Sequence, residues 1–262
     1  METRIFDFSM IGTALPDLLQ YLDITLLVAG SSIAFGSLLG MLLAWAKLDG
    51  VRPLYWLAQG YTYIIRCTPS IVLLFIVFYG LPEAADSIFS YDMNDMHRGV
   101  FAVIAFTMLF GAYISEVFRA AYMAVPRGQY EAAVCAGLSS MQAFFHIMLP
   151  QAALIALPNF GNSVISLLKE GALAYTIGLI DLIGRGNLLI SQNFGAYGIE
   201  IYLACLLIYW AMALGLEYIF GKAEQYLGKG RGVQAKKRTA RSSKALLKRL
   251  FSAGKGGEAH ET

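Results

Sequence analysis

Five long apolar stretches constrain the fold of this chain more than any other feature. They cover roughly residues 18–45, 64–81, 99–118, 150–168 and 198–220. A helix needs about 20 mainly apolar residues to cross a bilayer, whereas a water-soluble domain divides its apolar residues into stripes. Charged residues make up only 15% of the chain, against about 25% in soluble domains. The sequence therefore predicts an all-α integral membrane protein with five transmembrane helices.

The charges between these stretches predict how the chain crosses the membrane. Lys47 and Arg52 lie between the first two stretches, and Arg119 and Arg127 follow the third, whereas residues 83–97 carry four acidic residues. An excess of Lys and Arg marks the cytoplasmic side of a membrane protein. We therefore expect the N-terminus and the acidic loop outside the cell, and the C-terminus inside.

The C-terminal segment differs in composition from the rest of the chain. Residues 222–262 carry 11 Lys and Arg against three acidic residues. A basic segment rich in Gly, Ser and Ala is typical of a solvated tail. We expect a transmembrane domain over residues 1–222 and a basic, flexible cytoplasmic tail over residues 223–262. The tail either binds anionic lipid or serves only to fix the topology.

Three finer features of the spans follow from local patterns. Residues 52–63 are amphipathic and are expected to lie along the membrane interface, ahead of the second span. Gly36 and Gly40 form a GxxxG pair, which predicts that this face of the first span packs closely on another helix. Pro158 and Gly161, together with neighbouring asparagines, indicate that the fourth span is broken or bent.

The connection between the third and fourth spans is the most informative segment of the sequence. Pro126 suits the start of a helix, and the residues Glu131-Ala132-Ala133 favour one. Gly137 then interrupts this helix, and a second amphipathic piece leads to Pro150. Ala and Gly leave a nearly bare backbone, which can enter a groove on another protein. The sequence therefore predicts a helix–Gly–helix element that projects into the cytoplasm as a docking surface.

This connection resembles the EAA loop of importer permeases of the ATP-binding-cassette class. Its flanks are similar to the polar amino acid permeases, which include histidine, glutamine, arginine and cystine importers. The segments that carry the resemblance are Arg66-Cys67-Thr68-Pro69, Gly80-Leu81-Pro82, Gly111-Ala112-Tyr113-x-Ser115-Glu116-Val117-x-Arg119, Glu131-Ala132-Ala133, Gly137, Ile147-x-Leu149-Pro150 and Lys169-Glu170-Gly171-Ala172-Leu173. Cys67 stands where that family has Gly, and Gly171-Ala172 where it has Thr-Ser. Both departures bear on the substrate.

The resemblance implies a non-catalytic permease domain that moves a polar amino acid or amino acid derivative across the bacterial inner membrane. Its partners would be two copies of a separate ATPase subunit, a second permease chain, identical or related, and an extracytoplasmic solute-binding protein. ATP and Mg would bind to the ATPase, and this chain would need no cofactor, metal or nucleic acid. The coupling helix that docks on the ATPase would contain Glu131, Ala132, Ala133, Gly137 and Pro150. A short gate helix would follow Leu173.

Polar side chains within the spans are candidates for the solute path. They are Arg66, Glu116, Asn162, Lys169 and Glu170. A charge near the middle of a span costs about 2.5–3.5 kcal/mol on insertion scales, so such residues are candidates for function. Glu116 lies three residues before Arg119, so these two can simply form an ion pair. Lys169 and Glu170 either bind the carboxylate and ammonium of an amino acid or form an ion pair that closes a gate.

A different class of transporter is the alternative interpretation. An ion-gradient-driven transporter or channel subunit would work without an ATPase partner, and it would be expected to show internal repeats with paired broken helices. No such repeats are visible in the sequence. The three Gly-Lys pairs are not followed by Ser or Thr, so the chain has no P-loop. A membrane enzyme has still less support, because His, Cys, Asp and Glu form no cluster with metal-ligand spacing.

Overall fold

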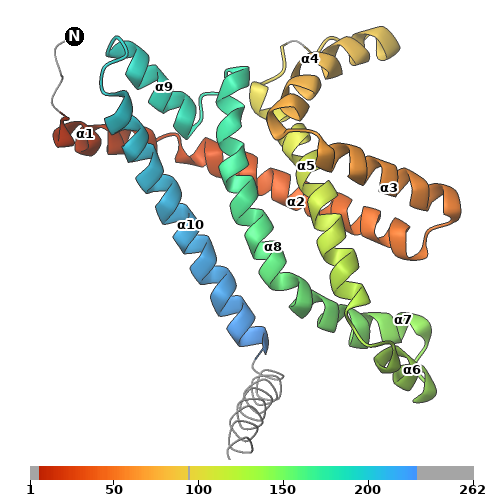
Figure 1. Ribbon diagram of the computed structural model, residues 1–262. Helices are drawn as coiled ribbons and strands as arrows, with labels where there is room; N and C mark the ends of the chain where they lie inside the picture. Colours follow the sequence, from red (N-terminus) through yellow and green to blue (C-terminus); the bar gives the residue numbers. More distant parts are fainter. Residues whose placement is uncertain (1–5, 94, 229–262) are drawn as a thin grey trace, which may run out of the picture. The chain divides into compact units, whose positions relative to one another are not determined.

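A computed structural model describes residues 6–93 and 95–228, and every regular element within them is helical (Figure 1). The elements are α1 (Phe8–Leu19), α2 (Leu22–Asp49), α3 (Arg52–Cys67), α4 (Ser70–Phe89), α5 (Arg98–Met123), α6 (Arg127–Cys135), α7 (Ser140–Ala143), a π-helical turn (Phe144–Met148), α8 (Leu149–Gly171), a 3-10 helix (Ala172–Ile177), α9 (Leu182–Gln192) and α10 (Gly198–Gly228). In Figure 1, α5 and α8 run side by side, and α6 and α7 lie where these two helices are connected.

Five helical segments in this part of the chain are long and apolar enough to cross a membrane. They are Leu22–Asp49, Ser70–Phe89, Arg98–Met123, Ser140–Ile177 and Gly198–Gly228. The predicted class, all-α with five membrane-spanning helices, is therefore confirmed. Helix α10 continues beyond the expected end of the transmembrane domain at residue 222. The remainder of the expected tail, residues 229–262, lies outside the described residues.

The predicted bounds of the second span are wrong. The prediction placed its start within residues that the structure assigns to the unbroken helix α3, and the chain leaves this helix only at Thr68, which is extended with φ −89° and ψ 129°. Pro69 causes this break, because it lacks an N–H and forces the preceding residue out of the helical region. That residues 52–63 lie along the membrane interface stays a prediction. Helix α3, with its buried residues Ala58, Thr62 and Ile65, packs against α2 and α5.

The fourth span was expected to be broken or bent, and the structure shows no break. Helix α8 is continuous from Leu149 to Gly171, with Pro158 inside it. Proline is tolerated within membrane helices because neighbouring groups satisfy the backbone that it frees. Gly161 does not break the helix but lets Phe220 of α10 pack closely on α8, since a Cβ at this position would lie 2.8 Å from Cγ of Phe220.

Helices α2 and α5 form the most closely packed pair. A Cβ at Gly36 would lie 2.9 Å from Cδ1 of Phe110, and a Cβ at Gly40 would overlap Ile114. On the other helix, a Cβ at Gly111 would lie 2.8 Å from Leu39. These glycines let the two backbones approach closely, as small residues do in membranes, where lipid supplies no hydrophobic drive for helix association. The prediction that the GxxxG face packs on another helix is confirmed.

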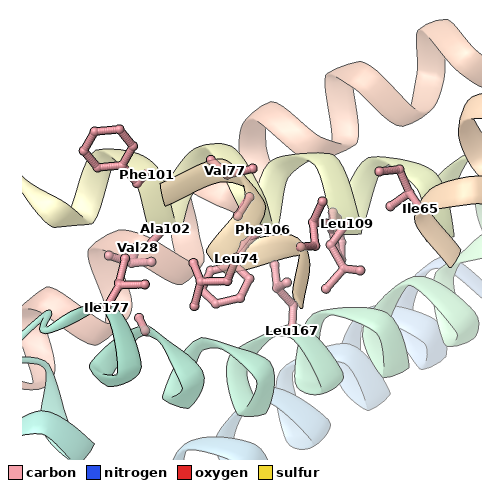
Figure 2. Close-up of a cluster of buried hydrophobic side chains, with 14 of the residues drawn as sticks. Val28, Ile65, Leu74, Val77, Phe101, Ala102, Phe106, Leu109, Leu167 and Ile177 are labelled. Carbon is pink, nitrogen blue, oxygen red and sulfur yellow. The ribbon is translucent and has the colours of Figure 1, made fainter. Parts of the chain in front are cut away.

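The main core surrounds this helix pair. Figure 2 shows Phe106 and Leu109 of α5 close to Leu74 of α4 and Leu167 of α8, all of which are buried. This core therefore holds α4 and α8 against the α2–α5 pair.

A second, separate cluster joins α1, α9 and α10. It contains Leu18, Leu182, Ile201 and Cys205. An ion pair of 2.6 Å between Arg185 of α9 and Asp17 of α1 reinforces it. The sequence did not predict α1 as a separate helix. Helix α1 begins at the N-cap residue Asp7, whose side chain accepts a hydrogen bond from the backbone N–H of Ser9.

Candidate functional site

A short helical hairpin connects α5 to α8. Helix α6 ends at Cys135, and Gly137 follows in the left-handed region with φ 92°. In this conformation the N–H of Gly137 donates to the carbonyl of Val134 (2.9 Å), and the N–H of Leu138 donates to that of Ala133 (3.1 Å). A left-handed residue after the last turn is a common helix ending and favours glycine. The predicted interruption of the helix at Gly137 is confirmed.

The second half of the hairpin is fixed by a capping box. The Ser139 hydroxyl accepts from the N–H of Gln142, and the Gln142 side chain accepts from the N–H of Ser139 (2.9 Å). Two donors that the start of a helix leaves unpaired are satisfied in this way. A π-helical turn then leads into α8, and Pro150 is in the first turn of that helix.

The hairpin presents a small, bare surface. Glu131 and Ala132 are exposed, whereas Ala133 is buried. A small core of Val125, Met148 and Ala152, with three aromatic neighbours, lies at the base of the hairpin. Glu131 has no hydrogen bond or ion pair within the described residues, so its carboxylate is available to a partner. The small core thus holds the base of the hairpin, while one acidic residue and several small residues stay exposed.

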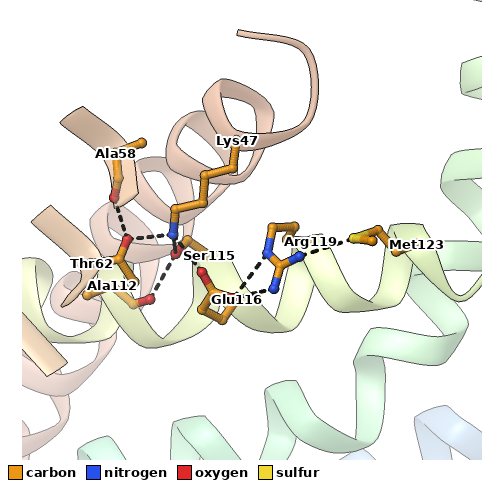
Figure 3. Close-up of polar contacts among 8 residues, drawn as sticks. All are labelled: Lys47, Ala58, Thr62, Ala112, Ser115, Glu116, Arg119 and Met123. Carbon is orange, nitrogen blue, oxygen red and sulfur yellow. Dashed lines mark hydrogen bonds and ion pairs between the residues drawn. The ribbon is translucent and has the colours of Figure 1, made fainter. Parts of the chain in front are cut away.

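A buried network of charged side chains lies along the last three turns of α5, the helix that precedes the hairpin (Figure 3). The Lys47 ammonium is fully buried and donates to the Glu116 carboxylate (2.8 Å), the Thr62 hydroxyl (2.5 Å) and the Ser115 hydroxyl (3.1 Å). The second oxygen of Glu116 accepts from Nε and Nη2 of Arg119, at 3.1 and 2.8 Å. Each buried polar group in this network is therefore hydrogen-bonded, as burial requires. The network joins α2, α3 and α5.

The predicted pairing of Glu116 with Arg119 is present, but the sequence did not reveal Lys47 as the third member. Sequence reasoning placed Lys47 in a loop between spans. Helix α2 instead extends to Asp49 and carries Lys47 into the packed interior. Lys47 lies seven residues after Gly40 and three after Ala44, which are both buried, and this helical spacing is the signal that could have revealed it.

The remaining path candidates lie in two places. Arg66 is exposed at the end of α3, with its guanidinium carbon 5.5 Å from the ring centre of Tyr113 on α5. Asn162 and Lys169 are both exposed on α8. Glu170, half-buried, follows Lys169 directly, and the two form no ion pair with each other. The gate formed by their mutual pairing is therefore not seen in this conformation.

Polar residues form a stripe along one face of α8. Asn159, Asn162, Ser166 and Lys169 are spaced by three or four residues, and all four are exposed. Residues at this spacing share one helix face. A polar face within a membrane-spanning helix is expensive next to lipid, so it indicates contact with another chain or with water.

A cavity of about 370 Å³ lies at the opposite end of α5 from the hairpin. It is lined by residues of three segments, the start of α2, the start of α5 and the turn before α9. Arg98 Nη1 donates to the carbonyl of Gly178 (2.9 Å), which is left-handed with φ 80°. Next to this turn, the carboxylate of Asp181 caps α9, and burial raises the pKa of Asp181 to about 6.

The fold and these sites define a class of protein: a helical membrane protein with polar residues inside its spans and an exposed hairpin between two of them. The chain belongs to the family described as binding-protein-dependent transport system inner membrane component, whose sequence model matches residues 36–225. It is thus an inner-membrane transport component, as the resemblance implied.

Several amino acid permeases are similar over most of their length. The chain is 40% identical to the L-cystine transport system permease protein TcyL of Bacillus subtilis, over 86% of this chain and 93% of the relative. It is 35% identical to the histidine/lysine/arginine/ornithine permease protein HisQ of Salmonella typhimurium, over 77% of this chain and 85% of that protein.

Solved structures agree with these relatives. A chain from an amino acid ABC transporter with histidines superposes with a TM-score of 0.74 at 28% identity, covering 85% of this chain and all of that chain. A chain of the MetNI methionine ABC transporter, at 18% identity and a TM-score of 0.62 over 80% of this chain and 95% of that chain, shares the fold alone.

Proposed function

We propose that this chain is the permease subunit of an ATP-driven importer of amino acids or their derivatives, coupled to a separate ATPase subunit. The observation that carries this proposal is the α6–α7 hairpin. Within the described residues, it exposes the Glu131 carboxylate without a partner and keeps a bare surface around it. The similarity to amino acid permeases supports the substrate class.

The expected assembly follows from the same features. The hairpin would face the cytoplasm, where an ATPase subunit could bind it, with one ATPase for each of two permease chains. A second permease chain, identical or related, would cover the polar stripe of α8. A solute-binding protein would deliver the amino acid on the outer side, and ATP and Mg would bind only to the ATPase.

Transport in proteoliposomes tests this function. The complex, purified with its ATPase and solute-binding protein, is expected to take up radiolabelled L-cystine, L-histidine or another amino acid only when ATP is supplied on the ATPase side. Uptake that persists without ATP and is abolished by a proton ionophore would instead indicate an ion-gradient-driven transporter.

A pair of hairpin variants separates docking from folding. Glu131→Ala removes the free carboxylate, and we expect roughly thirtyfold weaker association with the ATPase, as truncation of one member of an interfacial charge pair costs about 2 kcal/mol or more. Gln129→Ala, also exposed on α6, is the control and should bind the ATPase as the unmodified chain does. If Glu131→Ala bound the ATPase as tightly as Gln129→Ala and the unmodified chain, the docking role of the hairpin would be contradicted.

A further inference from the structure

The buried network on α5 carries more positive than negative charge. Lys47 and Arg119 both bind the single carboxylate of Glu116. The Lys47 side chain is completely buried, whereas 34% of the Arg119 side chain is exposed. One positive charge is therefore left over within the network, and it is Arg119 that can reach a molecule outside it.

Arg66 adds a second unneutralised charge to the same region. Its guanidinium group lies over the ring of Tyr113, one helical turn along α5 from Glu116. Arg66 is also near enough to Lys47 for their charges to repel each other. Tyr113 is exposed and holds the guanidinium by a cation–π contact, which orients Arg66 without neutralising it.

Other acids in the described part of the chain do not balance this charge. Asp49 is exposed at the end of α2, and within the described residues it forms no ion pair with Lys47, Arg66 or Arg119. Glu170 lies 21 residues into α8, about 31 Å along the helix from the hairpin. Among the described residues, the region thus holds three cations against one carboxylate.

The depth of this region makes the surplus costly. Tyr113, over which the Arg66 guanidinium lies, is 15 residues from the start of α5 and 10 from its end, or about 22 and 15 Å along the helix. Arg119 is only four residues, or about 6 Å, from that end, so it is Arg66 that lies deep within the span. Unpaired charge at such a depth is unfavourable by several kcal/mol unless an opposite charge or water compensates it. Arginine is suited to binding a carboxylate, because its planar fork can donate two parallel hydrogen bonds.

We propose that Arg66 and Arg119 form a subsite for the carboxylate group of the transported amino acid, with Tyr113 and Glu116 as the residues that hold the two guanidinium groups in place. Lys47 is a positioning residue, because it fixes Glu116 from the buried side. This subsite rests on the proposed function and refines it: the recognised group is a carboxylate, so an amino acid whose carboxylate is blocked should bind poorly.

Binding of matched acids and esters tests the subsite. L-cystine and L-histidine, each as the free acid and as its methyl ester, are titrated calorimetrically into the permease–ATPase complex in nanodiscs, without the solute-binding protein. The free acid should bind at least roughly tenfold more tightly than the ester, since hydrogen bonds between two charged groups are stronger than those to a neutral ester. Arg66→Gln should reduce this ratio by about tenfold through weaker binding of the acid alone.

Two control variants keep the result interpretable. Arg52→Gln removes a cation from the exposed start of the same helix and should leave the acid-to-ester ratio unchanged. Arg66→Lys keeps the charge but not the fork, and it should give an intermediate ratio even if Arg66→Gln fails to assemble. An unchanged ratio in Arg66→Lys and Arg66→Gln, with ATP-driven uptake intact, would overturn the subsite but not the proposed function. Absence of ATP-driven uptake of any amino acid in the unmodified complex would overturn both.

Discussion

The α6–α7 hairpin and the charge network of Lys47, Glu116 and Arg119 are built in opposite ways. The hairpin keeps the Glu131 carboxylate exposed and, among the residues that the structure describes, unpaired, and its shape depends on the backbone conformation at Gly137. The network buries its ammonium and satisfies every member with hydrogen bonds from three helices. The difference indicates a division of roles, in which the hairpin is open to a partner and the network ties together the helices behind it.

The largest effect that would test this comparison is expected from Lys47→Met. Removing one member of a buried ion pair leaves an uncompensated charge and typically costs about 3–5 kcal/mol. We therefore expect a markedly lower midpoint of thermal unfolding in detergent, measured by tryptophan fluorescence.

A double variant distinguishes the charge from the packing. Lys47→Met with Glu116→Gln removes both charges of the pair, and Arg119 is exposed enough to be solvated. Replacing a buried pair by neutral groups is often close to neutral for stability, so the double variant should recover much of the loss. If the double variant were as unstable as Lys47→Met alone, the network would owe its effect to side-chain volume instead of charge.

A smaller effect is expected in the hairpin from Gly137→Ala. A side chain in the left-handed region costs about 1–2 kcal/mol, so the hairpin should loosen and binding to the ATPase should weaken. The measurement is ATPase binding together with the unfolding midpoint.

Gly128→Ala is the matched control for this substitution. Gly128 lies in α6 without a positive φ and with open space around it, so alanine there should be neutral or slightly stabilising. Equal losses in the two variants would show that the conformation at Gly137 is not what shapes the hairpin.

The same two regions show what could be predicted from the sequence. The hairpin is determined locally, by Glu131-Ala132-Ala133, by the single Gly137 and by the Ser139 cap, so a reading of adjacent residues was sufficient. The network is not local. Lys47, Thr62 and Ser115 come from separate helices, and their meeting depends on how α2, α3 and α5 pack. A lysine near the end of an apolar stretch is therefore easily mistaken for a loop residue.

Proline ends a helix in one part of the chain and lies within a helix in another. For this reason the predicted bounds of the spans were inaccurate near the prolines. Pro69 ends α3 because Thr68 before it becomes extended, whereas Pro158 remains inside α8. The residues around each proline do not predict whether the helix ends before it or continues through it, because this depends on tertiary packing. The five spans were still predictable, because their length and apolar composition do not depend on such details.

Cross-linking from the native cysteines tests most directly the claim that the hairpin is the docking surface for the ATPase. Cys135 is exposed in the hairpin, Cys67 is exposed at the end of α3, and Cys205 is buried. In the purified complex, a short thiol-directed photo-cross-linker should join the Cys67→Ser variant, which keeps Cys135, to the ATPase, and should leave the Cys135→Ser variant unlinked. Cross-linking through Cys67 alone, or through neither residue in an intact complex, would contradict the account.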